Sequence, residues 1–142
     1  MDGYFRRGMA ALNLMNVCID EREAAGSHGR LYCRYQREPQ KFENEYQLLK
    51  MMEELMDRID YPQSSVEMRC YGKKTAVPIK QEEPCMTPEE VAEPVGECAT
   101  FLVYVQYRQN ATWQGEVFWQ ERRQLQTFRS ALELLKLLDS AR

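Results

Sequence analysis

The residues best suited to chemistry are few and lie far apart along the chain. There is one histidine, His28, and there are five cysteines: Cys18, Cys33, Cys70, Cys85 and Cys98. A structural zinc site usually draws its four ligands from two close pairs, and no two of these cysteines are spaced as Cys-x-x-Cys. We therefore predict no metal site. An odd number of cysteines favours free thiols and a reducing compartment.

Catalytic side chains are not indicated either. The acidic residues that cluster, Glu53, Glu54, Asp57 and Asp60, have the spacing of one solvated helix surface. General acid–base catalysis needs carboxylates held in distinct environments, which such a surface does not offer. His28 is the only histidine that could partner a serine or cysteine, but it stands in a predicted turn rich in Ala, Gly and Ser, where a lone histidine is normally solvated. The prediction is a protein that is not an enzyme and has no cofactor.

Composition excludes further classes. The 142 residues are 44% hydrophobic and 29% charged, enough for one modest core, and carry a net charge of −3. A slightly acidic chain does not bind nucleic acid or anionic lipid through bulk attraction. The longest apolar run, Phe101 to Val105, is far below the ~20 residues of a membrane helix. Asn13 and Asn16 interrupt the apolar stretch near the N-terminus, so we expect no secretory signal and a cytoplasmic location.

The middle of the chain differs from its flanks. Residues 73–97 hold four prolines, six glutamates and no aromatic residue. Such a segment buries too little to offset its ordering entropy, so we predict a flexible acidic linker with one helical turn at 87–92. The linker divides a first unit, 1–72, from a second, 98–142. The alternation of Val66, Met68 and Cys70 indicates that a short edge strand could extend the first unit. The spacing of Phe5, Met9 and Leu12 indicates that the N-terminus could form a helical turn.

The two flanks resemble each other when the chain is shifted by 86 residues, which aligns Gly29 with Gly115 and Phe42 with Phe128. Each copy reads as strand, turn, strand, loop and helix, with Asn44 and Ser130 as N-caps. A hairpin followed by any capped helix would look similar, so the pattern alone leaves that alternative open. We predict an α+β fold: two duplicated ββα units that form a four-stranded, mainly antiparallel sheet with both helices on one face.

The strand pattern also predicts a binding surface on the sheet face away from the helices. Aromatic, arginine and amide side chains are expected there, with one aromatic residue at the second hairpin tip: Tyr32, Arg34, Tyr104, Gln106, Arg108, Trp113 and Phe118. Such residues favour a protein partner or self-association. They also suit single-stranded nucleic acid or a nucleotide. A third alternative is that they cover one another. We predict a small non-enzymatic binding or regulatory protein, with a nucleic-acid or nucleotide binder as the alternative.

Two resemblances accompany this interpretation. Asn110-x-Thr112-x-x-Gly115 is similar to the Asn/Asp-x-Ser-x-x-Gly motif of PilZ domains, which implies cyclic di-GMP binding and a six-stranded barrel. The residues upstream show neither that barrel nor the Arg-rich motif of the family. Separately, residues 105–115, 128–139 and 61–65 resemble stretches of an uncharacterised family of small proteins from anaerobic clostridial bacteria. That resemblance implies a bacterial cytosolic protein and attaches no activity or ligand to it.

Overall fold

Six strands form one antiparallel sheet in the computed structural model, which describes residues 5–24, 26–62, 82–109 and 112–141. The order across the sheet is β3-β2-β1-β4-β5-β6. The strands are β1 (Met15–Glu23), β2 (Gly26–Cys33), β3 (Gln36–Phe42), β4 (Ala99–Gln109), β5 (Thr112–Trp119) and β6 (Gln124–Phe128). The helices are α1 (Arg6–Met9), α2 (Glu45–Ile59), α3 (Pro88–Ala92) and α4 (Ala131–Ser140). The α+β class is as predicted.

The prediction of four strands is wrong, because β3 and β6 lie where loops were expected. Both are edge strands and largely exposed, and their sequences, QREPQKF and QLQTF, lack the apolar alternation of a half-buried strand. Pro39 in β3 is tolerated because an edge strand has one row of backbone groups without a ladder partner. The additional edge strand expected around Val66 to Cys70 lies outside the described residues.

Strand register follows the predicted shift of 86 residues. In the first half Met15 lies opposite Cys33, and in the second half Phe101 lies opposite Trp119. A register irregularity follows Ile19 in β1 and Val105 in β4, again 86 residues apart. Each repeated unit is therefore βββα, one strand longer than the sequence predicted.

Gly29 and Gly115 occupy the same place in the two units. Each lies opposite a buried phenylalanine of the next strand, Phe42 and Phe128 respectively. A Cβ atom on Gly29 would stand 1.9 Å from the carbonyl oxygen of Cys18, and one on Gly115 would stand 2.1 Å from that of Tyr104. Only glycine allows this close approach of two backbones.

The central pair of strands joins the two units symmetrically. Asn16 of β1 lies opposite Leu102 of β4, and these two residues are themselves related by the shift of 86. On either side, Met15 lies opposite Val103 and Val17 lies opposite Phe101. The shift relates Met15 to Phe101 and Val17 to Val103, so each of these pairs is the symmetry equivalent of the other. A pseudo-twofold axis therefore passes between Asn16 and Leu102.

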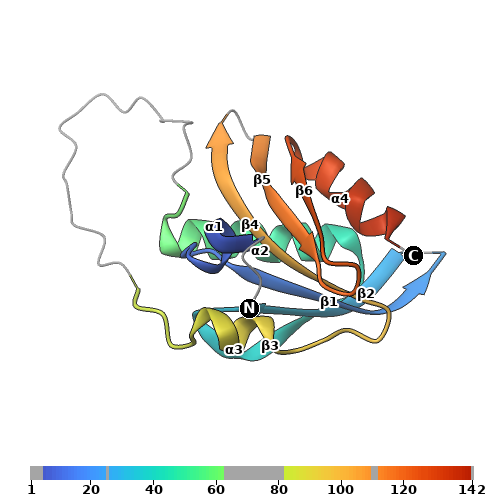
Figure 1. The fold of residues 1–142 in the computed structure, drawn as a ribbon, viewed down its shortest axis with the longest axis horizontal. Coiled ribbons are helices and arrows are strands. Elements are labelled where there is room, and N and C mark those ends of the chain that lie inside the picture. Colours follow the sequence, from blue (N-terminus) through green and yellow to red (C-terminus); the bar gives the residue numbers. More distant parts are fainter. Residues whose placement is uncertain (1–4, 25, 63–81, 110–111, 142) are drawn as a thin grey trace.

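Helices α2 and α4 pack on one face of the sheet, as predicted, and we call this the inner face (Figure 1). Their N-caps are as expected: Asn44 accepts a hydrogen bond from the amide of Gln47 at 2.9 Å, and Ser130 from that of Glu133 at 3.0 Å. The inner core includes Leu48, Met52 and Leu55 of α2, Leu134 and Leu138 of α4, and the inward residues of the strands. In α4 the fully buried side chain is that of Leu134, and Leu135 is half-buried.

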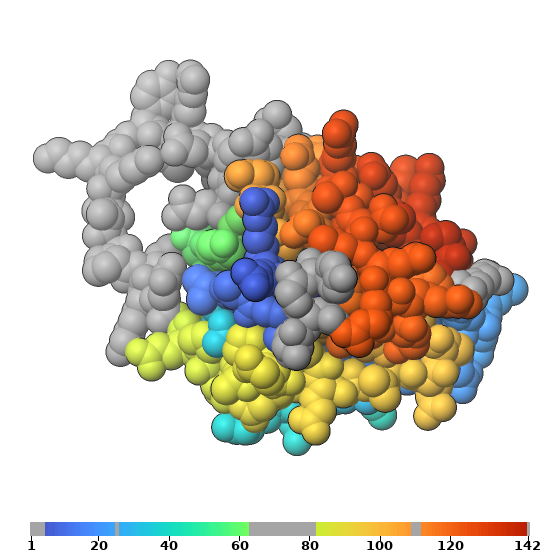
Figure 2. Space-filling model, viewed as in Figure 1, coloured from blue at the N-terminus to red at the C-terminus, as the bar shows by residue number. Residues whose placement is uncertain are grey.

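The opposite, outer face is covered by α1, α3 and the segment 82–98. In Figure 1 α3 lies in front of the strands and α2 behind them, and Figure 2 shows segment 82–98 (yellow) spread over the front of the molecule. Val91 is fully buried there, in a cluster with Phe5 of the N-terminal turn. Within the described part of the segment predicted as a linker, 82–97, most residues are exposed, and Val91 is the buried residue that docks the segment on the sheet. The helical turn itself was expected, and its complete capping box at Thr87 and Glu90 explains it.

Candidate functional site

Three of the predicted binding residues meet on the outer face, but they are not available to a partner. Tyr104 is 4% exposed, Phe118 is 1% exposed, and Tyr32 packs half-buried against their cluster. The ring of Phe5 covers those of Tyr104 and Phe118, and its centroid lies 5.7 Å from the centroid of each. The hydroxyl of Tyr104 donates a hydrogen bond to Glu116, and burial together with this bond raises the pKa of Tyr104. The predicted exposed aromatic face is thus an outer core.

The polar members of the predicted set are divided. Arg34 remains on the outer face, where its Nε donates to the carbonyl of Met86 at 3.1 Å. The Arg34 carbonyl in turn accepts from the amides of Cys85 and Met86. Gln106 of β4 is half-buried. Arg34 therefore holds the segment 82–98 and is not free to bind a partner.

Arg108 lies on the inner side, contrary to the prediction, and Trp113, expected at the hairpin tip, also packs there. The irregularity after Val105 inserts a residue and reverses the alternation of side chains beyond it. Arg108 is 5% exposed and donates to the carbonyl of Pro62 and to the Asp57 carboxylate, both at 2.7 Å. Trp113 is 6% exposed and belongs to the inner core. Asn110, the first residue of the PilZ-like motif, is outside the described residues, and the open sheet differs from the barrel that this resemblance implies.

Arg22, the equivalent of Arg108 in the first unit, makes the reciprocal contact. Its NH2 donates to the carbonyls of Leu138 and Ala141, at 2.9 and 2.8 Å, at the end of α4. Arg108 binds the end of α2 in the same way, through Asp57 and the nearby carbonyls. Cations are stabilised at helix C-termini, where carbonyls lack helical partners. Each unit therefore caps the helix of the other.

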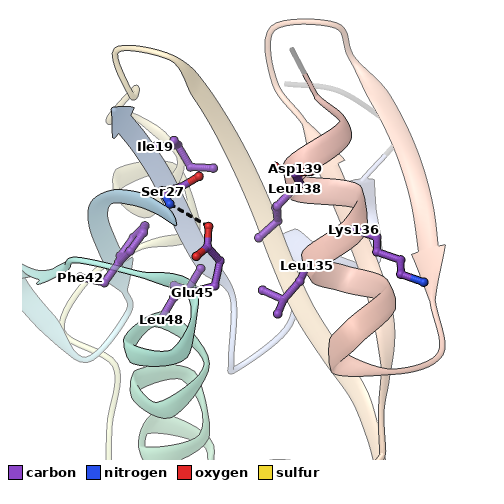
Figure 3. A pocket seen from close by; sticks show the side chains of 9 residues that line it. All are labelled: Ile19, Ser27, Phe42, Glu45, Leu48, Leu135, Lys136, Leu138 and Asp139. Atoms are coloured by element: carbon purple, nitrogen blue, oxygen red, sulfur yellow. Dashed lines mark hydrogen bonds between the residues drawn. The ribbon is translucent and has the colours of Figure 1, made fainter. Parts of the chain in front are cut away.

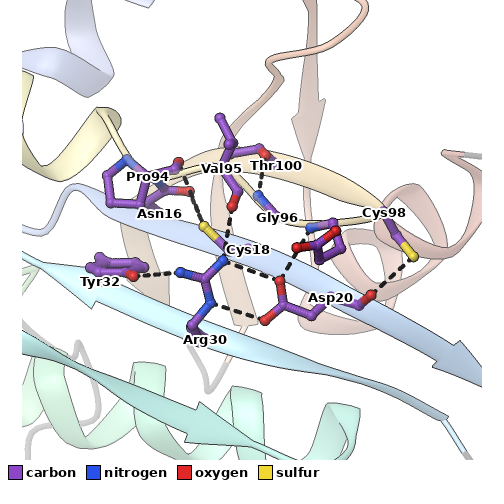
Figure 4. Close-up of polar contacts among 11 residues, drawn as sticks. Asn16, Cys18, Asp20, Arg30, Tyr32, Pro94, Val95, Gly96, Cys98 and Thr100 are labelled. Carbon is purple, nitrogen blue, oxygen red and sulfur yellow. Dashed lines mark hydrogen bonds and ion pairs between the residues drawn. The ribbon is translucent and has the colours of Figure 1, made fainter.

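A polar network fastens the segment 82–98 across β1 and β2 (Figure 4). Asn16 donates to the carbonyls of Val91 and Pro94, at 2.9 and 2.8 Å. Arg30 forms a two-point ion pair with Asp20, at 2.9 and 3.1 Å, and also donates to the carbonyl of Val95. The hydrogen bond from Arg30 lowers the pKa of Asp20. Asn16, Asp20 and Arg30 therefore use their polar groups to attach the segment 82–98 to the sheet.

Cys18 lies within the same network and is unsuited to nucleophilic chemistry. Its thiol is buried, and this burial raises its pKa to about 12. A thiol with so high a pKa has almost no thiolate at neutral pH, and the thiolate is the reactive form. Cys18 is therefore a structural residue.

The inner face carries a pocket that the sequence did not predict. It lies between the start of α2 and the end of α4 and has a volume of about 310 Å³ (Figure 3). Its apolar lining comes from β1, β3 and both long helices: Ile19, Phe42, Leu48, Leu135 and Leu138. The polar lining consists of Ser27, Glu45, Lys136 and Asp139. We call this the cleft pocket.

Glu45 is held in a defined position at the cleft pocket. Its Oε1 accepts a hydrogen bond from the backbone amide of Ser27 at 2.7 Å, drawn as a dashed line in Figure 3. Its Oε2 has no hydrogen-bond partner among the residues that the structure describes. The side chain of Lys136 points away from the other lining residues in Figure 3. Glu45 thus lines an apolar cavity with a carboxylate whose Oε2 lies close to Gly26 and has unused acceptor capacity.

The pseudo-twofold axis relates the cleft pocket to a second one, of about 440 Å³, at the other end of the groove between α2 and α4. Its lining residues are Tyr46, Leu49, Lys50, Glu53, Trp113 and Ala131. Shifted by 86 residues, Ser27 corresponds to Trp113 and Glu45 to Ala131. The two ends of the groove therefore differ chemically, since only the cleft pocket has a carboxylate at the helix start.

Sequence reasoning missed the cleft pocket because its walls come from elements far apart in the chain. Glu45 reads as an ordinary first-turn acid that favours the helix N-terminus. Nothing local signals that α4 would face it across a groove. Only the alignment of the two units could have hinted at a difference, since it places Glu45 opposite Ala131.

Comparisons of the chain with protein-family models, curated proteins and solved structures found no match. Among the described helices, none has both the length and the apolar character needed to cross a bilayer. A function for this protein is therefore inferred from its fold and pockets.

Proposed function

We propose that this protein is a non-enzymatic binding protein that holds a small amphiphilic molecule in the cleft pocket. The observation that carries the proposal is the fixed carboxylate of Glu45, with one unused oxygen, at the edge of an apolar cavity. Pockets that bind small molecules are mostly apolar, with a few polar groups that set orientation. A volume of about 310 Å³ lies at the small end of the usual range, ~300–1,000 Å³.

The charge at the cleft pocket favours a cationic head on this molecule. Glu45 supplies a carboxylate held by the amide of Ser27, whereas the side chain of the one lysine in the lining points away from the other lining residues. An ammonium group could donate to Glu45 Oε2 while an apolar body fills the space between Phe42, Leu48 and Leu135. A hydrogen bond to a charged acceptor is worth about twice a neutral one. The proposed ligand class is therefore a compact hydrophobic amine.

The two halves fit an internal duplication, which we propose as the origin of the fold. Support comes from the shared register, bulges, glycines and N-caps at a constant shift. One copy has filled its corner of the groove with Trp113, whereas the other keeps Ser27 and the carboxylate of Glu45. This division favours one specialised binding end.

A nucleic-acid or protein interface on the outer face is less well supported. Binding there would require α1 and the segment 82–98 to leave, and with them the contacts of Asn16, Arg30 and Arg34. Arg108, expected to clamp a partner, is committed to the end of α2. No observation on the outer face favours this second function over the cleft pocket.

The test is an NMR titration of the isotope-labelled full chain with 2-phenylethylamine, 2-phenylethanol and 3-phenylpropionate. We expect the amine to shift amide signals around Ser27, Leu48 and Leu135 with a Kd near the millimolar range. The alcohol should bind more weakly, and the acid should not bind. These three probes share a ring and differ in the charge of the head group.

Two variants sharpen the test. Glu45→Gln should weaken amine binding about tenfold and remove the preference for amine over alcohol. Glu53→Gln, at the other end of the groove, is the matched control and should change neither. Equal shifts by all three probes, or an unchanged preference in Glu45→Gln, would contradict the proposal.

A further inference from the structure

A second group of side chains, independent of the cleft pocket, lies at the far end of the first hairpin. Glu21 of β1 lies directly opposite His28 of β2, and Glu23 follows two residues later on the same side of the strand. The Nε2 atom of His28 is 3.1 Å from Oε2 of Glu21 and 3.5 Å from Oε1 of Glu23. All three ligand atoms lie within 4.8 Å of one another.

We propose that Glu21, Glu23 and His28 bind a single divalent transition-metal ion, with Zn²⁺ as the reference case. Zinc takes imidazole nitrogen and carboxylate oxygen at ~2.0–2.2 Å in a tetrahedral arrangement, which places neighbouring ligand atoms roughly 3.3–3.6 Å apart. Both contacts of His28 fall close to that spacing without rearrangement of the backbone. One imidazole and two carboxylates are a mixed nitrogen and oxygen set suited to zinc, cobalt or nickel.

The fourth position of such a site would be open. The side chains of Glu21 and Glu23 are 65% and 60% exposed, and that of His28 is 34% exposed, so water reaches the ligand atoms from outside. Zinc sites with three protein ligands keep a water or another molecule in the remaining position. The proposed site is therefore an exchangeable surface site, unlike the closed four-ligand sites that hold small domains together.

The other half of the molecule serves as an internal control for this cluster. The equivalent residues there are Tyr107, Gln109 and Gln114, none of which is a strong zinc ligand. The β4–β5 hairpin nevertheless has the same register, with Tyr107 opposite Gln114. The hairpin therefore forms without two glutamates and a histidine, and its fold does not account for their gathering in the first unit.

Neighbouring charges leave the cluster free to bind a cation. Asp20, the adjacent residue of β1, is neutralised by its two-point ion pair with Arg30. Glu21 and Glu23 contact His28, and a neutral imidazole between two carboxylates leaves a local charge of −2. A divalent cation would neutralise that charge. The competing explanation is a protonated His28 that pairs with both glutamates and binds no metal.

The experiment uses the untagged full chain, reduced and free of chelator, titrated with Zn²⁺. His28 is the only histidine, so the imidazole signals in the proton NMR spectrum report on this site alone. We expect these signals to shift to a limiting value at one equivalent of Zn²⁺. Calorimetry should give a stoichiometry of one for the same event.

Variants and a cobalt spectrum separate this site from other metal ligands. His28→Gln and the double variant Glu21→Gln, Glu23→Gln should each weaken Zn²⁺ binding at least tenfold. The double variant Glu89→Gln, Glu93→Gln, which removes two exposed carboxylates of the α3 region, should leave it unchanged. Bound Co²⁺ should show weak visible bands without the intense near-ultraviolet absorption of cysteine thiolate coordination.

Three results would overturn the proposal. The first is no shift of the His28 signals at tenfold excess Zn²⁺. The second is binding of unchanged affinity in His28→Gln, and the third is thiolate absorption with Co²⁺, which would move the metal to the cysteines. Circular dichroism of every variant shows whether the fold is retained. Because the cleft pocket plays no part in it, this test stands or falls independently of the proposed function.

Discussion

At the scale of single residues, four arginines of this protein have structural roles. Arg22, Arg30, Arg34 and Arg108 each donate to backbone carbonyls of a distant segment. A guanidinium has five donors in a fixed plane, so one side chain can satisfy several carbonyls at once. The two arginines predicted to lie on an exposed aromatic and arginine face, Arg34 and Arg108, instead join separate segments of the chain.

Replacing Arg108 with Ala should therefore destabilise the fold. The side chain is buried, and its loss leaves the carbonyl of Pro62 without this donor and the Asp57 carboxylate without its ion pair, at a cost of about 1–3 kcal/mol. Arg129→Ala removes an exposed arginine and should change the free energy of unfolding by less than ~0.5 kcal/mol. Urea denaturation followed by circular dichroism gives both values. Equal, small effects would mean that Arg108 does not cap α2.

At the scale of elements, the segment 82–98 behaves as part of the outer face. Its proline and glutamate content is that of a linker, yet Val91 is buried beneath the capped turn of α3. Backbone carbonyls of the segment accept hydrogen bonds from Asn16, Arg30 and Arg34. Composition alone predicts low burial, but one apolar residue on a short, well-capped helix is enough to anchor a polar segment.

The corresponding prediction contrasts two valines of the same segment. Val91→Ala should lower the free energy of unfolding by ~1–3 kcal/mol, because it leaves a cavity against Phe5 and Leu102. Val95→Ala removes the same atoms from a side chain that is 64% exposed and should have little effect. Denaturation midpoints of the two variants, measured side by side, are the test. If Val91→Ala matched Val95→Ala, the segment would not be docked in solution.

Elements also show where prediction from sequence succeeds. Three features were predicted because each depends on local sequence. They are the N-caps Asn44 and Ser130, the equivalence of Gly29 and Gly115 in the two units, and the alternation of β1, β2, β4 and β5. Strands β3 and β6 were missed because exposed edge strands need no apolar alternation. Arg108 was placed on the wrong face, because an irregularity after Val105 reverses the side-chain alternation of β4, and no glycine or proline in the sequence indicates it. The cleft pocket depends on contacts between units, which no local pattern contains.

At the scale of the whole molecule, the two units are interdependent. The sheet is continuous through the β1–β4 pair, and each unit's arginine binds the helix end of the other unit. Neither unit could unfold alone without breaking the capping contacts of its partner. The whole described structure is therefore expected to unfold as one.

This expectation can be measured because both tryptophans, Trp113 and Trp119, lie in the second unit. Tryptophan fluorescence reports on that unit, whereas far-ultraviolet circular dichroism reports on both. Denaturation curves from the two signals should coincide, as for a two-state domain. A fluorescence transition separated from the dichroism transition would show that the units unfold independently.

The axis between Asn16 and Leu102 has a consequence for the history of the chain. A polypeptide with a single βββα unit would leave the edge of its first strand unpaired, and would lack the arginine that caps its helix. A second copy, related by a true twofold axis, would supply both through an isologous interface. The present chain thus has the geometry of a homodimer whose subunits have become covalently joined. In the duplication proposed above, fusion would free each former subunit to change alone, which a symmetric dimer forbids, and this would explain how the carboxylate of Glu45 and the cluster around His28 could arise in one half only.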